Sequence, residues 1–349
     1  MAYTTPVSLL YFFVGAVATF ANLTIAWLLC KVKSHHHRSA YLYMVNLALA
    51  DSVMCAIVGC YVGAATLNRT REAAQTVVCF LDICCWFVGV LTYAALGFNR
   101  YVAVCRSAPS SLVIFDNVIV TLLLCCFTWV VGVSVGLVSC LPRPTLGLAP
   151  GDVMTMSYNM NMSRAQTIMW LNVGTNGFSV CVQWICSSLV LAQICKTHHA
   201  DVHRHKQQVR VFLQFFYPSI VCTFSSFMFF TLPFYAEFMA SWLFIISHLI
   251  WLTNHACNPF LYLYLNKKLR HRLADLLVKN INTHSDSSSS AAKAKSNRRK
   301  ASASRCEHAN KLLSCKSDSD ASELKQFRKK LVLAELSSSV TPHICESTT

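Results

Sequence analysis

Residues 254–262 read Asn-His-Ala-Cys-Asn-Pro-Phe-Leu-Tyr, which sets amides, a proline and a tyrosine inside an otherwise apolar run. The proline removes one backbone hydrogen bond and kinks a helix. In a hydrocarbon environment the lost bond needs a replacement partner, which Asn258 or a trapped water can supply. A helix with this weak point takes up two shapes at low cost. The stretch is therefore either a structural kink whose polar groups are all hydrogen-bonded or a conformational switch.

The composition around this stretch is that of a membrane protein. Of the 349 residues, 54% are hydrophobic and 13% are charged, which is too apolar for a soluble domain of this length. A membrane-crossing helix needs about 20 mostly apolar residues. The stretches that satisfy this are residues 7–29, 41–66, 77–98, 114–140, 166–193, 211–236 and 242–264. The predicted fold is all-α, a seven-transmembrane helix bundle over residues 1–279.

The segment after the last span changes in character. Residues 266–279 are basic and amphipathic, which predicts a short helix on the membrane surface. Residues 280–349 are rich in serine and poor in aromatic residues, which predicts a disordered tail. Basic residues precede Ser302, so Ser302 and Ser304 are candidate phosphorylation sites.

Lysine and arginine decide the orientation of such a bundle. They concentrate in the loops that share a side with the C-terminal tail, so we expect an outside N-terminus and a cytoplasmic C-terminus. Glycosylation sequons begin at Asn68 and Asn161, and both fall in loops assigned to the outside. The net charge of +15 is mostly cytoplasmic. It suits anionic membrane lipid and acidic partner surfaces better than nucleic acid.

Two acidic residues lie inside the spans. Asp51 stands in the second span, where an unpaired carboxylate costs at least ~2.5 kcal/mol. It should face the bundle interior and either bind a cation or meet Asn22, Asn254 or Asn258.

Asp82 and Arg100 are 18 residues apart in the third span. This spacing is five full turns, so both lie on one helix face, ~27 Å apart along the axis. Trp86 shares that face. Asp82 either pairs with a cationic ligand or has a structural role, bonded to a neighbouring hydroxyl or to His248.

Taken together, the order of these features resembles that of the rhodopsin-like, or class A, G protein-coupled receptors. Each motif is short, but their sequence across seven spans is specific. The matching positions are Asn22, Leu47 and Asp51, Asn99-Arg100-Tyr101, Trp129, Phe227 and Pro233, and Asn258-Pro259 with Tyr262.

The resemblance implies a mechanism. An extracellular ligand, of which Asp82, Trp86, Phe234, Tyr235 and His248 are the candidate contacts, shifts the bundle between two packings. The sixth helix swings outward on the cytoplasmic side.

The same resemblance implies the partners. Asn99, Arg100, Tyr101, Asn258, Pro259 and Tyr262 form the switch that engages a heterotrimeric G protein. Kinases and arrestin act on the tail, and the receptor works in the plasma membrane. A sodium ion at Asp51, Asn254 and Asn258 favours the resting state, and no other cofactor is expected.

Several departures from the family pattern are informative. Asn99 replaces the usual aspartate, so Arg100 loses its adjacent carboxylate, which predicts ligand-independent signalling. Thr231 stands where the sixth helix usually has a tryptophan. The family's outer disulfide would have to join Cys79 to Cys140. The divergence resembles an invertebrate chemosensory or orphan peptide receptor, with a biogenic amine bound through Asp82 as an alternative.

Other classes of function remain open at this point. No cluster of nucleophile, base and orienting group is present, so we do not expect an enzyme. An ion or solute transporter or channel would use Asp51 and Asp82 to line a path, but the internal repeats of such folds are missing. A non-signalling decoy receptor is the third possibility.

Overall fold

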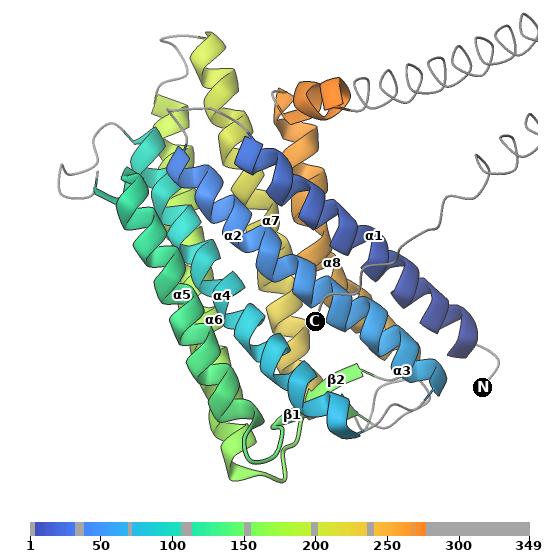
Figure 1. The fold of residues 1–349 in the computed structure, drawn as a ribbon. Helices are drawn as coiled ribbons and strands as arrows, with labels where there is room; N and C mark the ends of the chain where they lie inside the picture. Colours follow the sequence, from blue (N-terminus) through green and yellow to red (C-terminus); the bar gives the residue numbers. More distant parts are fainter. Residues whose placement is uncertain are drawn as a thin grey trace, which may run out of the picture. The chain divides into compact units, whose positions relative to one another are not determined.

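The computed structural model describes residues 4–31, 38–68, 72–105, 114–149, 155–196, 202–235, 241–267 and 269–276. These residues form a bundle of long helices with one small hairpin (Figure 1). The predicted tail over residues 280–349, with Ser302 and Ser304, lies outside the described residues.

Each predicted span coincides with a helical segment. The helices are α1 (Thr4–Lys31), α2 (Arg38–Cys55), the π-helical turn η1 (Ala56–Tyr61), α3 (Val62–Asn68), α4 (Glu72–Val104), α5 (Val118–Cys140), α6 (Ser163–Lys196), α7 (Val202–Tyr235) and α8 (Ser241–Leu265). Elements α2, η1 and α3 follow one another without a break and form the second span. Residues 269–276 are helical as well, within the segment predicted as a surface helix, and this short helix turns away from α8 (Figure 1).

Within the described residues, the segments from α1 to α7 supply six spans that are long and apolar enough to cross a membrane. The last helix, α8, has 25 residues and is not among these six. Its histidine and asparagine side chains, His248, Asn254, His255 and Asn258, are all buried. They point into the protein, as polar groups in a membrane helix must.

Large apolar side chains cover the outside of the bundle. Phe20 of α1 and Leu123 of α5 are 73% and 64% exposed. A soluble protein rarely shows such continuous apolar surface, whereas a lipid environment favours it. The polar groups lie inside, which is the distribution of a membrane protein.

Small residues let α1 approach the second span closely. A Cβ atom on Gly15 would lie 2.6 Å from the Gly59 Cα atom, and one on Gly59 would lie 2.4 Å from the Gly15 Cα atom. Small residues at such crossings allow the backbones of membrane helices to touch. Gly59 belongs to the π-helical turn η1, which the sequence analysis did not predict.

The fourth span begins later than predicted. We expected it to begin at residue 114, but α5 begins at Val118 because Asn117 caps it. The Asn117 side chain accepts a hydrogen bond from the Ile119 backbone N–H at 2.8 Å. This cap frees Phe115 and Asp116 to contact the neighbouring helices.

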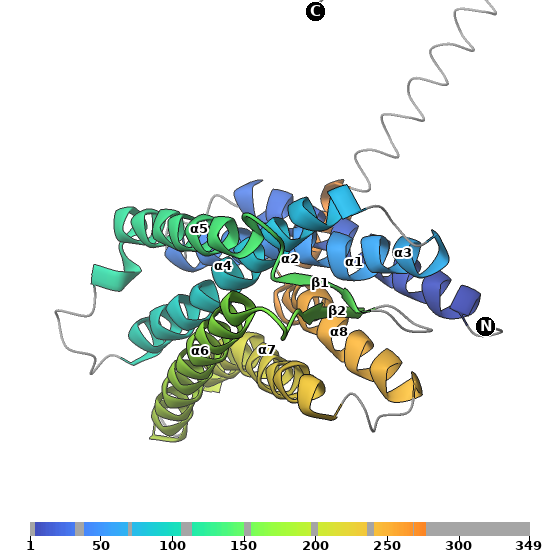
Figure 2. The same cartoon turned by 90° about the horizontal axis from the view of Figure 1, so that it is seen from below.

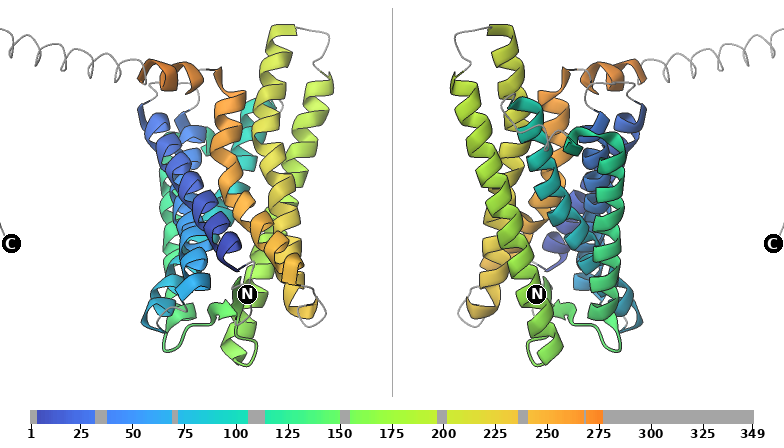
Figure 3. Two further views of the ribbon diagram at one scale, coloured as in Figure 1. Left: turned by 90° about the vertical axis from the view of Figure 1, so that its right-hand side faces the viewer. Right: turned by 90° about the vertical axis from the view of Figure 1, so that its left-hand side faces the viewer.

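A two-stranded hairpin lies between α5 and α6. Strands β1 (Leu146–Ala149) and β2 (Thr155–Tyr158) pair antiparallel, with Leu146 opposite Tyr158. Seen from its own end of the bundle, the hairpin lies across the middle of the helices (Figure 2). We call this the hairpin end and the opposite one the Arg100 end, where α6 and α7 project beyond the other helices (Figure 3).

Candidate functional site

Asp51 is the centre of a buried polar cluster in the middle of the bundle. Its side chain is 1% exposed, and both carboxylate oxygens are engaged. Oδ1 lies 2.8 Å from His255 Nδ1, and Oδ2 accepts a hydrogen bond from Asn258 Nδ2 at 2.7 Å. The Asn258 amide also donates to the Tyr93 hydroxyl at 2.5 Å. Helices α2, α4 and α8 are therefore joined at one point.

The kink at Pro259 receives its replacement bond from α1. Proline lacks an N–H, which leaves the carbonyl four residues earlier, that of His255, without its helical donor. Asn22 Nδ2 donates to this carbonyl oxygen at 3.0 Å. We had expected Asn258 or a water in this role and Asn22 as a partner of Asp51. Asn258 instead bonds Asp51, and Asn22 serves the backbone beside it.

Asn254 does not join the Asp51 cluster. Its side chain is buried, and its Oδ1 atom has no hydrogen-bond partner among the described atoms. No hydrogen bond connects it to Asp51. Of the residues expected to hold sodium with Asp51, Asn258 bonds the carboxylate, and His255 rather than Asn254 takes its other side.

Arg100 is buried near the other end of α4, at 5% exposure. Its Nη2 atom contacts the Met44 sulfur at 3.5 Å. In the part of the chain that the structure describes, no carboxylate lies within ion-pair distance of the guanidinium; the one ion pair recorded there is His255–Asp51. Tyr262 is buried and close enough to interact with the Arg100 charge. The neighbouring Tyr101 is half-buried against Phe98, with ring centroids 6.2 Å apart.

Asn99 binds a carboxylate from a different element. Its Nδ2 atom donates to the Phe115 carbonyl at 3.0 Å and to Asp116 Oδ1 at 3.3 Å. Ser39, at the start of α2, donates to the same Asp116 oxygen. Position 99 lacks the family's carboxylate, and Asp116 supplies one nearby. It is hydrogen-bonded to Asn99 and Ser39 and makes no ion pair with Arg100.

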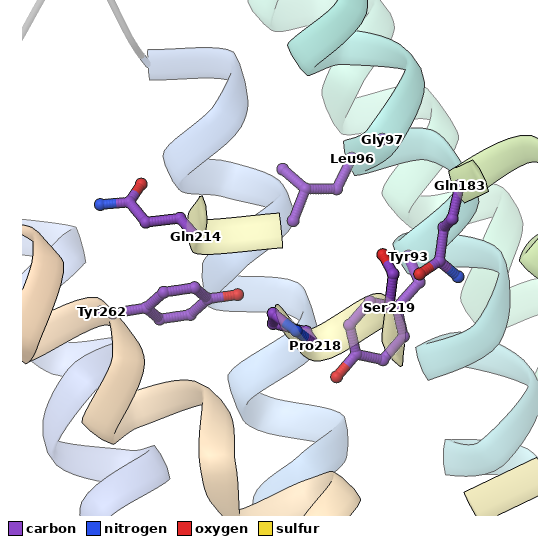
Figure 4. A pocket seen from close by; sticks show the side chains of 8 residues that line it. All are labelled: Tyr93, Leu96, Gly97, Gln183, Gln214, Pro218, Ser219 and Tyr262. Atoms are coloured by element: carbon purple, nitrogen blue, oxygen red, sulfur yellow. The ribbon is translucent and has the colours of Figure 1, made fainter. Parts of the chain in front are cut away.

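A small cavity lies between α4, the helix that carries Arg100, and α7. It has a volume of about 10 Å³, room for one water at most. Side chains from α4, α6, α7 and α8 converge on it, including Tyr93, Gln183, Ser219 and Tyr262 (Figure 4). The packing between α4 and α7 is therefore incomplete at this level.

Asp82 and Trp86 face the interior nearer the hairpin end. Asp82 is 3% exposed, and its Oδ1 atom has no hydrogen-bond partner among the described atoms. No bond joins it to His248, which we had considered as its partner. His248 Nε2 instead lies 2.7 Å from the Val58 carbonyl and Nδ1 lies 3.2 Å from the Thr155 hydroxyl. Because a carbonyl only accepts, Nε2 carries the hydrogen and Nδ1 accepts from Thr155.

An aromatic cluster connects this region to the Asp51 cluster. Trp86 of α4 packs against Phe229 of α7 and Trp251 of α8, with ring centroids 5.9 Å and 6.0 Å apart. Phe229 and Trp251 are themselves 4.8 Å apart. Trp86 also meets the His255 ring edge to face at 5.5 Å. We call Trp86, Phe229 and Trp251 the aromatic triad.

Comparison with known proteins decides the family. The profile of the family described as 7 transmembrane receptor (rhodopsin family) matches residues 21–262, from just before Asn22 to Tyr262. The chain belongs to this family. It is a G protein-coupled receptor and not an enzyme, and the match decides against a transporter or channel.

Two similar proteins agree with this assignment. A Caenorhabditis elegans protein described as a probable G-protein coupled receptor is 28% identical over 337 residues, covering 79% of this chain and 67% of its own length. The crystal structure of squid rhodopsin superimposes with a TM-score of 0.65 at 13% identity, covering 80% of this chain and 87% of the rhodopsin chain. The second likeness confirms the all-helical transmembrane fold.

The remaining predicted sites of the receptor are placed as follows. Phe234 and Tyr235 end α7, but their side chains lie outside the described ones. Asn68 ends α3, and its side chain is not described either. Asn161 is exposed beside the hairpin.

The outer disulfide is not formed in the receptor. Cys79 and Cys140 are buried free thiols. Cys79 Sγ lies 3.6 Å from the Ser139 hydroxyl, and the Cys140 thiol donates to the Leu137 carbonyl of its own helix at 3.5 Å. Each sulfur therefore has a partner other than the second cysteine.

Sequence reasoning missed several residues of the receptor site. His255 adjoins the predicted Asn254, and its placement in an apolar helix was the only available signal. Asp116 had no such signal, because its position depends on the cap at Asn117. The hairpin contributes Tyr158, whose hydroxyl accepts a hydrogen bond from Asn172 at 2.8 Å. Burial raises the pKa of the Tyr158 phenol above its usual value, so the side chain stays neutral.

Proposed function

We propose that the receptor lies in the plasma membrane with its hairpin end outside and its Arg100 end in the cytoplasm. The loop charges and the exposed sequon residue Asn161 support this orientation. An extracellular ligand then enters beside the hairpin. Asp82, Trp86 and His248 are its proposed contacts, with Phe234 and Tyr235 at the adjoining end of α7.

The observation that carries this proposal is the unpaired carboxylate oxygen of Asp82. A buried anion without a partner costs several kcal/mol, and a cationic ligand group would recover part of that cost. We therefore propose a ligand that carries a positive charge. Both a biogenic amine and a basic peptide or chemosensory ligand meet this requirement.

The aromatic triad provides a physical route from the ligand to the core. Trp86 follows Asp82 by one helical turn, and it contacts both Trp251 and His255. A ligand that displaces Trp86 changes the packing of α7 and α8 through Phe229 and Trp251. The triad thus fills the role that the family tryptophan, replaced here by Thr231, would have.

The output side lies around Arg100. We propose that outward movement of the Arg100 end of α7 exposes Arg100 and Tyr262 to a heterotrimeric G protein. Because of the cavity, α4 and α7 make fewer packing contacts at this level, so this movement breaks fewer of them. Kinases and arrestin then act on the serine-rich tail at residues such as Ser302 and Ser304.

Screening with cationic ligands tests the proposed input. Cells that express the receptor with a panel of G protein sensors are exposed to amines and basic peptides, each paired with an uncharged analogue of the same shape. We expect a response only to charged members. Asp82→Asn should lower ligand potency by at least about tenfold, the equivalent of ~1.4 kcal/mol, at unchanged basal signal. An equal response to the uncharged analogues would contradict the role of Asp82.

A further inference from the structure

The residues around Asp51 do not fit the sodium ion that the family resemblance implies. Sodium needs several oxygen ligands, of which a carboxylate oxygen is the strongest. Each Asp51 oxygen already accepts one hydrogen bond from nitrogen, Oδ1 at 2.8 Å from His255 and Oδ2 at 2.7 Å from Asn258, and the His255 ring beside Oδ1 offers an ion no oxygen ligand. The amide oxygens of Asn254 and Asn258 lack partners among the described atoms. They are uncharged, however, so they do not replace the engaged carboxylate.

The buried carboxyl group of Asp51 needs polar partners inside the bundle. The ionisable groups that face it and interact with its charge are thiols and phenols: Cys55 of α2, Cys85 and Tyr93 of α4, Cys222 of α7, and Cys257 and Tyr262 of α8. Such groups are neutral or negative and never positive. From α1 the Asn22 amide, which is neutral, bonds the His255 carbonyl. Among the described residues, His255 is the one basic side chain in ion-pair contact with Asp51.

His255 is also held in place on its other sides. Its backbone oxygen accepts from Asn22 at 3.0 Å, and its ring packs edge to face against Trp86. The ring nitrogen Nε2 is buried without a hydrogen-bond partner among the described atoms. The imidazole is therefore fixed between the carboxylate and the aromatic triad.

We propose that the His255 imidazole takes the place beside Asp51 that the family resemblance assigns to a sodium ion, so that the resting state of this receptor is independent of sodium. The contact between Nδ1 and Oδ1 and the hydrogen bond from Asn258 to Oδ2 hold the carboxyl group without an ion. Because Trp86 touches the imidazole, a ligand that moves Trp86 also acts on this pair. The test of this proposal needs neither the ligand nor the G protein coupling proposed above.

Thermal unfolding of the purified receptor in lipid nanodiscs tests this proposal. The unfolding midpoint is measured in sodium chloride and in potassium chloride at equal concentration. For the wild type we expect the same midpoint in both salts. A higher midpoint in sodium would overturn the proposal, and this arm needs no variant.

His255→Ser supplies the second arm, because it removes the imidazole and leaves a small oxygen ligand. We expect this variant to unfold at a higher temperature in sodium than in potassium, by the stabilisation that a bound ion confers. His248→Ser is the matched control, since His248 bonds Val58 and Thr155 and not Asp51. It should show no difference between the salts. Equal midpoints for His255→Ser in the two salts would show that the histidine does not stand in for sodium. If that variant does not fold, His255→Gln takes its place with the same expected outcomes.

Discussion

Asn22 shows how one side chain can compensate for a proline in a helix more than 200 residues later. Its amide donates to the carbonyl that Pro259 leaves free, and it also donates to Ala18 of its own helix at 3.1 Å. The bond ties α1 to the kink of α8, and therefore to the residues that hold Asp51. At this scale the receptor depends on single donors and acceptors inside lipid, where no bulk water replaces them.

Removing the Asn22 donor should destabilise the receptor. We expect Asn22→Ala to cost about 0.6–1.7 kcal/mol, from the average to the largest value found for hydrogen bonds between membrane helices. The measurement is the thermal unfolding midpoint of the purified protein. Thr24→Ala is the control, since Thr24 donates to Phe20 on the exposed face of the same helix. An equal loss of stability in both variants would show that the hydrogen bond to α8 contributes no more than a bond on the exposed face.

The pair formed by Asn99 and Asp116 permits an exchange of residues. The double variant Asn99→Asp with Asp116→Asn keeps a donor and an acceptor at the two positions but moves the charge next to Arg100. We expect ligand-independent signalling to fall, because Arg100 gains an ion-pair partner that restrains it. Basal second-messenger levels at matched surface expression measure this effect.

Asp116→Asn alone is the control for the exchange. It removes the charge but leaves an oxygen that accepts from Asn99, so basal signalling should stay at the wild-type level. Undiminished signalling in the double variant would argue against the restraint on Arg100 as the cause.

At the scale of elements, the close approach of α1 and the π-helical turn η1 determines how the first two spans pack. Gly15 and Gly59 meet there at a distance that leaves no room for a side chain. The turn η1 adds a local irregularity at the same place, and its Val58 carbonyl accepts from His248. The elements α1, η1 and α8 are thus positioned together on the wall of the proposed ligand site.

A methyl group at this crossing should be costly. We expect Gly59→Ala to lose about 1–3 kcal/mol through overpacking, although alanine favours helix in itself. Gly174→Ala is the control, because a Cβ atom at Gly174 meets nothing within 4 Å. The unfolding midpoints of the two variants decide the matter. A Gly59→Ala receptor as stable as Gly174→Ala would mean that the two backbones can separate without loss.

At the scale of the whole molecule, the fold follows from the sequence because each span is long, apolar and bounded by polar loops. The spacing between Asp82 and Arg100 predicted that both lie on one face of α4, and both are buried. The partner of Asp51 was harder to predict. The kink at Pro259 and the bond from Asn22 decide which side of α8 faces α2, and His255 rather than Asn254 is presented there.

The hairpin and Asp116 lay beyond the reach of sequence reasoning for a different reason. Strands of four residues carry too little alternation to be recognised, and tertiary contacts such as that between Thr155 and His248 hold them. Asp116 reaches Asn99 only because α5 begins late, at its cap. Both are consequences of packing and not of local pattern.

The central claim is that Arg100, buried without a carboxylate partner, leaves the receptor able to signal without ligand. The most direct measurement is the rate of nucleotide exchange on purified heterotrimeric G proteins, with the receptor in nanodiscs and no ligand added. We predict a rate above that of each G protein alone, and a return to that background for Arg100→Ala at equal receptor concentration. A wild-type rate no higher than background with every G protein tested would contradict the claim and would favour a decoy receptor.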